Sequence, residues 1–317
     1  MDLLDLLVKI GVDDQASAKV DEVAGGIGSK LGAAAGKAAS LVAAGVTAVA
    51  AGVAAVTGMS MNAYAAYEQN VGGIQKIFGN MGKSLEDYAA MTGQSVEQCS
   101  GKWQQLEQAQ TTVLKNADEA YKTAGMSANQ YMEQVTGFSA ALVSSLGGDT
   151  VKAAEYANTA MVDMSDNANT FGTSMEDLQN AYQGFAKQNY TMLDNLKLGY
   201  GGTKEEMQRL LSDAEKISGV KYDISSYADV VDAIHVMQES MDIAGTTAKE
   251  AEGTISGSVN ALKSSVTNLV VGFGDANADL DVLCENVVTA FQTVLENISP
   301  IVENLISALP AVITTLL

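Results

Sequence analysis

The chain has 317 residues, with 18 basic and 38 acidic side chains and a formal net charge of −20. Hydrophobic residues make up 47% of it, which excludes a wholly disordered chain. Proline occurs only 2 times, where average usage would give roughly 16. Because proline interrupts helices, its scarcity disfavours turn-rich sandwiches and barrels. We predict an all-α fold, with a compact helical bundle flanked by long apolar or heptad-patterned helices at both ends.

The residues that build most catalytic and metal sites are rare in this chain. Cys99 and Cys284 lie far apart, and His235 is the one histidine, so neither a disulfide framework nor a zinc site is expected. Arg209 is the one arginine, and specific nucleic-acid binding is not expected without clustered cations. The N-terminal segment 1–24 lacks the basic start of a secretory signal peptide. We therefore expect no enzyme, no cofactor and no metal.

A hydrophobic helix rich in Ala, Gly and Val is predicted over residues 25–83. Small residues recur at every fourth position, and valines follow at steps of four and three. The first pattern allows close helix approach, and the second is the spacing of a helix–helix seam. Two interpretations stay open for residues 38–61, namely buried self-association and a membrane-spanning helix. The residues predicted for self-association here are Gly28, Gly32, Gly36, Val42, Val46, Val49, Gly52, Val53 and Val56.

Residues 84–245 are predicted to form a helical core domain. Five capping boxes mark helix starts, at Ser95/Gln98, Ser127/Gln130, Thr173/Glu176, Thr203/Glu206 and Thr247/Glu250. Glycines that can end helices stand at Gly125, Gly147, Gly148, Gly172 and Gly219. Apolar stripes at helical spacing begin at Tyr131, Val151, Met207 and Tyr227. The irregular segment 184–202 is predicted to be an ordered loop packed on the bundle.

Long heptad-patterned helices are predicted over residues 246–317. The stripe runs through Ile255, Val259, Leu262, Val266, Leu269 and Phe273, and resumes at Leu280. Sustained spacing of this kind indicates self-association, and we assign that role to Leu262, Val266 and Leu269. Pro300 and Pro310 are expected to kink or restart the helix. The apolar end of the sequence suggests that the region continues in a longer parent chain.

His235 is the one candidate for histidine chemistry. Asp232, His235 and Glu239 can share one face of a helix, but no further ligand is near in sequence. We interpret His235 as the polar edge of the stripe that contains Val231 and Ile234. Cys284 lies beside that kind of stripe in the last helix and is interpreted as a small buried hydrophobe.

Six stretches of the chain resemble the bacteriophage tail tape measure family, in the N-terminal part of that family's chain. They are DLLVKIGVDD (5–14), AYEQNVGGIQKIFG (66–79), AYKTAGMSANQYMEQVTGFSAAL (120–142), residues 145–211, ISSYADVVDAIHVMQ (224–238) and GTTAKEAEGTISGSV (245–259). The resemblance implies a structural virion protein in the lumen of the tail tube, which sets tail length, templates tube assembly and is released during genome ejection.

The resemblance also implies partners. They are other copies of the chain in a trimer or another small homo-oligomer, the tail tube protein, the tail assembly chaperones, the distal tail proteins and, at infection, the host membrane. The alternative functions are a membrane-active or pore-forming helical protein and a secreted helical adhesin or effector.

Overall fold

The computed structural model describes the backbone of residues 53–316 and the side chains of residue 60 and residues 62–301. Every regular element in this part of the chain is a helix, so the all-α prediction is confirmed there. The α-helices are α4 (Val53–Ile77), α5 (Leu85–Thr92), α6 (Val96–Thr123), α7 (Ala128–Ser145), α8 (Thr150–Phe171), α9 (Met175–Phe185), α10 (Lys204–Ser218), α11 (Tyr227–Ser240), α12 (Thr246–Gly253), α13 (Ile255–Gly272) and α14 (Leu280–Leu316). One short 3-10 helix, η2, spans Leu193–Leu196.

The chain divides into two compact units. The larger unit spans residues 66–264 and includes the whole of the predicted core domain. The described part of the other unit consists of residues 53–65 and 265–316. Helices α4 and α13 each contribute residues to both units.

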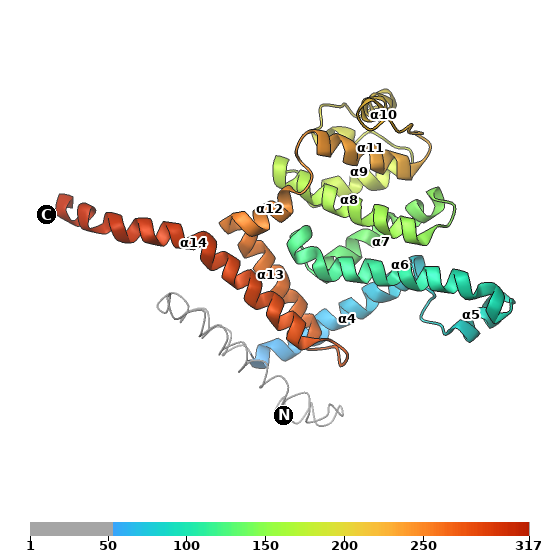
Figure 1. The fold of residues 1–317 in the computed structure, drawn as a ribbon, viewed down its shortest axis with the longest axis horizontal. Coiled ribbons are helices and arrows are strands. Elements are labelled where there is room, and N and C mark those ends of the chain that lie inside the picture. Colours follow the sequence, from blue (N-terminus) through green and yellow to red (C-terminus); the bar gives the residue numbers. More distant parts are fainter. Residues whose placement is uncertain (1–52, 317) are drawn as a thin grey trace. The chain divides into compact units, whose positions relative to one another are not determined.

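Helix α8 is the central element of the larger unit. It contacts α6, α7, α9, α11 and α12, and Figure 1 shows it between the layers formed by α6 and α7 on one side and α11 on the other. Its buried face consists of Ala153, Ala154, Ala157, Ala160, Met161 and Met164, all fully buried. Four alanines let the neighbouring helices approach closely, and the two methionines fill the gaps that remain.

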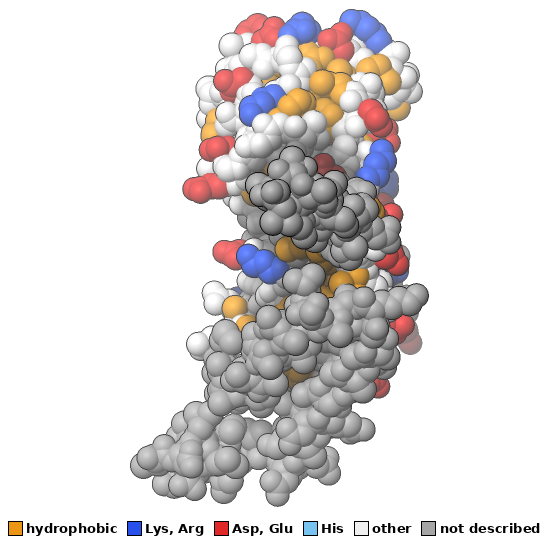
Figure 2. All heavy atoms as spheres, turned by 90° about the vertical axis from the view of Figure 1, so that its left-hand side faces the viewer, with side chains coloured by type: hydrophobic (Ala, Val, Ile, Leu, Met, Phe, Trp, Pro, Cys, Tyr) orange, Lys and Arg blue, Asp and Glu red, His pale blue; other side chains and the backbone are white. Residues whose placement is uncertain are grey.

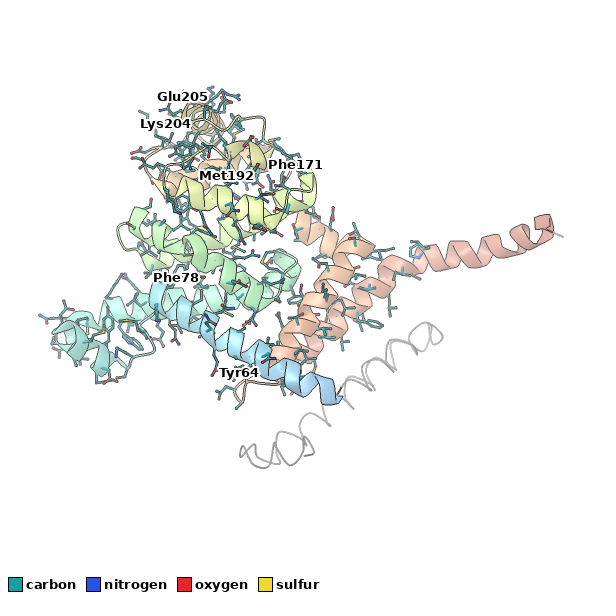
Figure 3. The ribbon with its side chains drawn as sticks, turned by 180° about the vertical axis from the view of Figure 1, so that it is seen from behind. Tyr64, Phe78, Phe171, Met192, Lys204 and Glu205 are labelled. Carbon is teal, nitrogen blue, oxygen red and sulfur yellow. The ribbon has the colours of Figure 1, made fainter. Side chains whose placement is uncertain are left out.

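The predicted stripes form the core, except at the ends of two of them. Tyr131, Val135, Phe138 and Leu142 of α7 are all buried, and Phe78, which follows α4, points into the same core (Figure 3). In contrast, Ile217 at the end of α10 is 54% exposed and Met241 beyond α11 is 43% exposed. The apolar spacing in the sequence continues to the end of these helices, but the neighbouring helices do not extend far enough to cover the last apolar side chain.

Two of the five predicted capping boxes are complete, and the predicted glycine stops all have the backbone conformation that ends a helix. Ser95 with Gln98 and Ser127 with Gln130 form complete capping boxes. Thr203 caps α10, but the Glu206 carboxylate accepts from Gly201 N instead of reaching back to the cap. The prediction at Thr173 is wrong by one residue, because Ser174 caps α9 while the Thr173 hydroxyl donates to Asn195 O. The glycines predicted to end helices all have positive φ.

The segment between α9 and α10 is an ordered loop on the bundle, as predicted. Tyr190, Leu193, Leu196, Leu198 and Tyr200 from this segment are buried in the main core. Phe171 and Met192, labelled in Figure 3, pack against the same core and are partly buried. Five buried apolar side chains fix this irregular segment without regular backbone pairing.

The smaller unit contains a close turn and the longest helix. Gly274 lies so near to α4 that a Cβ built on it would be 2.5 Å from Cβ of Tyr64 (Figure 3), a separation that real side chains do not adopt. Helix α14 then runs for 37 residues through both prolines, so of the two predicted alternatives, a kink or a restart, the restart is excluded. Each proline removes one backbone donor, and the rest of the ladder continues.

Candidate functional site: a buried polar cluster on helix α8

One turn of α8 carries four buried polar residues in the middle of the apolar core. Asp163, Ser165, Asp166 and Asn167 are all buried, and each makes a long-range hydrogen bond to a different segment. We call these four residues the α8 polar cluster. A buried polar group costs free energy unless it is paired, so these contacts specify which segments pack against α8.

Asp163 pairs with the one histidine of the chain. The Asp163 Oδ1 atom lies 2.8 Å from Nδ1 of His235 on α11, and because a carboxylate can only accept, Nδ1 carries the proton in this bond. Asp163 is fully buried, whereas 31% of the His235 side chain is exposed. Glu239 lies on the exposed side of the imidazole, with its Oε1 atom 3.5 Å from Nε2. His235 thus connects a buried carboxylate to a solvent-exposed one.

Burial and pairing shift the proton affinities of both partners upward. Desolvation raises the pKa of Asp163 to about 6, and the hydrogen bond from His235 partly offsets this rise. The hydrogen bond to Asp163 raises the pKa of His235 above its usual range, against the opposing effect of partial burial. The pair therefore holds protons more tightly than the same groups in an unfolded chain.

Asp166 caps a helix that is distant in sequence. Its Oδ2 atom accepts from Gly245 N at 2.6 Å, and its Oδ1 atom accepts from Thr247 N at 2.8 Å. These amides begin α12, which has no side-chain cap of its own. The capping box predicted at Thr247 is therefore wrong, because a carboxylate from α8 occupies the place of the local cap. A negative charge at this helix start also complements the helix dipole.

The other two cluster residues bind backbone carbonyls. Ser165 Oγ donates to Ala124 O, just after α6, at 2.6 Å. Asn167 Nδ2 donates to Leu196 O in η2 at 2.7 Å. Together with Asp163 and Asp166, they connect α8 to the end of α6, to η2, to α11 and to the start of α12.

The one arginine of the chain also has a structural partner set. Its guanidinium lies over the Tyr200 ring, 4.3 Å from the centroid, and Nη2 donates to Gly199 O at 2.9 Å. The same guanidinium pairs with Glu206 on α10. Arg209 therefore holds the loop before α10 against that helix. On the face drawn in Figure 2, acidic and basic side chains are interspersed.

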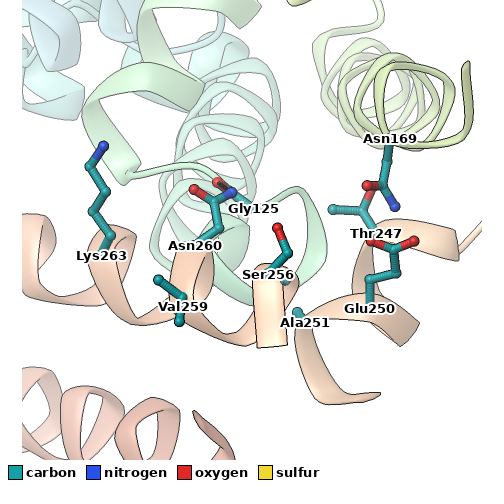
Figure 4. Close-up of a pocket in the computed structure, with 10 residues that line it drawn as sticks. Gly125, Asn169, Thr247, Glu250, Ala251, Ser256, Val259, Asn260 and Lys263 are labelled. Carbon is teal, nitrogen blue, oxygen red and sulfur yellow. Dashed lines mark hydrogen bonds between the residues drawn. The ribbon is translucent and has the colours of Figure 1, made fainter. Parts of the chain in front are cut away.

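A cleft of 330 Å³ adjoins the start of α12 (Figure 4). Part of its wall is fixed, because Asn260 Nδ2 and Ser264 Oγ both donate to Gly125 O. Glu250 and Lys263 place opposite charges on its lining, so the cleft has no single-sign preference. Its lining residues are Gly125, Asn169, Thr247, Glu250, Ala251, Ser256, Gly257, Val259, Asn260 and Lys263.

The chemistry available at the polar cluster is proton binding and helix anchoring. Among the described side chains, those of residue 60 and residues 62–301, no three from His, Cys, Asp or Glu are placed to hold a metal ion. Asp232, His235 and Glu239 share a face of α11 as predicted, but the strongest partner of His235 is Asp163 on another helix. Cys99 and Cys284 are buried and take part in no disulfide, so the predicted burial of Cys284 is confirmed.

The residues predicted for self-association are only partly described. Gly28, Gly32, Gly36, Val42, Val46, Val49 and Gly52 lie outside the described residues, and Val53 and Val56 lie in α4 without described side chains. On α13, Leu262 is half-buried, Val266 is 41% exposed and Leu269 is buried. The three residues therefore do not form one uniformly exposed stripe.

Helix α13 instead buries a face made of small and polar residues. Ser258, Ala261, Ser264 and Ser265 are buried. Two apolar residues of the predicted stripe, Ile255 and Val259, are 36% and 46% exposed. Of the six residues of the predicted stripe, Ile255, Val259 and Val266 are exposed, Leu262 and Phe273 are half-buried and Leu269 is buried.

The α8 polar cluster is not among the candidate residues predicted from the sequence. The available signal was the run DMSDN (163–167) in the middle of a helix. Asp, Ser and Asn are poor residues for a helix interior and favour competing backbone bonds, so a run of them in an otherwise apolar helix can indicate tertiary pairing.

No helix in the described range is both long enough and apolar enough to cross a membrane. A scan of protein-family models finds no match to the chain. Comparisons with curated proteins and with solved structures find no similar chain either.

Proposed function

We propose that this chain is a structural protein of the tail tape measure type, which acts in the lumen of a phage tail tube and not as an enzyme. The six stretches that resemble that family support the proposal, as does the all-helical architecture. In this role the chain sets tail length, works with the tail tube protein, the chaperones and the distal tail proteins, and leaves the tail during genome ejection.

The observation that carries the proposal is the partly exposed apolar face of α13, made of Ile255, Val259 and Val266. Ile255, Val259 and Val266 are all exposed, and their separations of four and seven residues place them on one side of the helix. A neighbouring side of α13 is buried within the chain and includes Ser258 and Ala261. A helix with one face packed and a second apolar face exposed is suited to bind another helix, and another copy of the chain supplies one in a trimer or small homo-oligomer.

A protein that sets tail length must itself have a defined length, and long helix supplies it. Helix α14 has 37 residues, and a rise of 1.5 Å per residue makes it roughly 55 Å long. A helix converts residue number into distance at a fixed ratio, so a ruler made of helix has a length that its gene determines.

Charge supports the same role. The net charge of −20 repels the phosphate backbone of DNA. A protein that occupies the tube before the genome passes through it must leave without holding that genome. A strongly acidic chain meets this condition.

The test is tail length in a phage or prophage that carries insertions in this gene. Tandem copies of residues 281–294, two heptads within α14, should lengthen the tail by roughly 20 Å per copy. Negative-stain microscopy over a series of one to three copies should give a slope of roughly 1.5 Å per residue.

The matched control inserts 14 residues into the ordered loop at 186–192. That insertion adds no continuous helix, so it should impair assembly and leave the length of any surviving tail unchanged. If the α14 series yields tails of constant length, the ruler proposal is wrong, and the membrane-active alternative becomes the better one.

A further inference from the structure

The contact between Asp163 and His235 crosses from α8 to α11 in a place where solvent reaches only one partner. Asp163 is fully buried, and its Oδ2 atom has no hydrogen-bond partner among the described residues. The His235 imidazole is partly exposed and lies 2.8 Å from the other oxygen. The charge of this contact therefore responds to pH through a group that bulk water can reach.

The groups around the pair are acidic or neutral. On α11, Glu239 and Asp232 act on His235 through space, and on α8, Asp166 acts on Asp163. The hydroxyls of Tyr182 on α9 and Tyr227 on α11 are buried, and burial raises the pKa of both, so they stay neutral at physiological pH. Of the described groups that act on Asp163, only His235 can supply a positive charge.

We propose that Asp163 and His235 form a proton-linked lock, which tightens the packing of α8 against α11 as pH falls through neutrality and loosens it as pH rises. In the locked state the imidazolium Nδ1–H donates to the buried carboxylate. When the imidazolium loses its Nε2 proton to solvent, Nδ1–H still donates, but the buried carboxylate no longer has a compensating charge. An unpaired buried charge is strongly destabilising.

The direction of the pH dependence follows from the folded-state pKa values of both partners. His235 has a folded-state pKa above its usual value, so its contribution is complete below about pH 6.5 and is lost as pH rises through the folded-state pKa. Asp163 has a folded-state pKa of about 6 instead of 3.8, so protonation between those values also favours the folded state. Protonation of Asp163 below about pH 6 removes the negative charge that the imidazolium pairs with, so the ion pair is complete between that pH and the folded-state pKa of His235 and is lost as pH rises further.

The lock can affect more than one helix. Asp166 lies three residues after Asp163 on α8 and holds the first amides of α12, and α12 leads directly into α13. Two successive contacts on α8 thus anchor α11 and the segment that enters α13. This inference does not depend on the proposed tape measure role.

The single histidine makes the test direct. In the full chain labelled with ¹³C-histidine, one imidazole signal reports the titration of His235 between pH 5 and 9. The expected midpoint lies above 6.5 in the wild type and is lower in Asp163→Asn, which keeps the shape of the side chain and removes its charge. A wild-type midpoint at or below 6.5, or equal midpoints in the two proteins, would overturn the proposal.

Two controls separate pairing from general loosening. Asp166→Asn weakens the cap of α12 but leaves Asp163, the partner of His235, in place. The titration midpoint of His235 in this variant should therefore stay near that of the wild type. A decrease of the midpoint as large as that in Asp163→Asn would overturn the lock. The melting temperature of the wild type should decrease from pH 6 to pH 8.5, and that of His235→Gln should change less. Parallel pH profiles in the two proteins would also contradict the proposal.

Discussion

Removing the Asp166 carboxylate should destabilise the larger unit more than removing an ordinary helix cap. Asp166→Ala abolishes two hydrogen bonds to a charged acceptor, at 2.6 and 2.8 Å, and leaves the amides at the start of α12 without partners. Each such bond contributes about 1.5–3 kcal/mol. Because alanine also removes the cost of burying a carboxylate, we expect a net loss near the lower bound for two bonds, about 3 kcal/mol.

The matched control is Asp149→Ala at the start of α8. The Asp149 carboxylate caps its own helix by accepting from Lys152 N at 3.1 Å, in an exposed place. Loss of a local cap of this kind costs about 1 kcal/mol. In a unit of this size, 1 kcal/mol corresponds to about 2–4 °C in melting temperature, so the expected decreases are about 6–12 °C for Asp166→Ala and about 2–4 °C for Asp149→Ala.

The assay is thermal unfolding followed by circular dichroism at 222 nm, together with amide hydrogen exchange. Exchange should accelerate most in α12 (Thr246–Gly253) for the Asp166 variant and in the first turn of α8 for the Asp149 variant. If Asp166→Ala costs no more than Asp149→Ala, or if α12 keeps its protection, the assignment of Asp166 as the cap of α12 is refuted.

Two further pairs of variants, each with its control, test the exposed face of α13 and its contact with α12. Val259→Glu places a charge on the exposed apolar face of α13 and should lower the weight-average mass measured by analytical ultracentrifugation. Ser256, on the same helix, is also exposed, and Ser256→Glu should leave that mass unchanged. Equal masses for the two variants would contradict the assembly role of the apolar face. Gly257→Ala should destabilise by about 1–3 kcal/mol, because its Cβ would lie 2.2 Å from the Glu250 carbonyl oxygen. Gly101→Ala in α6 is the control, because no atom lies within 4 Å of a Cβ built there, and it should stabilise the protein by about 0.4–1 kcal/mol. Chemical denaturation measures both variants. The opposite order of stability would refute the close contact between α12 and α13.

Local signals in the sequence were sufficient for the helices and for many of their boundaries. A capping box such as that of Ser95 and Gln98 needs only residues three apart, and a glycine with positive φ ends a helix without help from distant residues. The apolar stripe of α7 predicted its buried face for the same reason, because helical periodicity alone places those side chains on one side. Hence the all-α class followed from composition and spacing.

Tertiary structure decided which signals were used and what the polar residues do. Thr247 has the spacing of a cap, but the carboxylate of Asp166, which is distant in sequence, binds its amide instead. The sequence pattern places His235 at the polar edge of a stripe, and only the fold shows that its imidazole pairs with the buried Asp163 on another helix. Sequence periodicity reports which side of a helix is apolar, but a buried polar residue is stable only through its partner, and the fold alone brings these partners together.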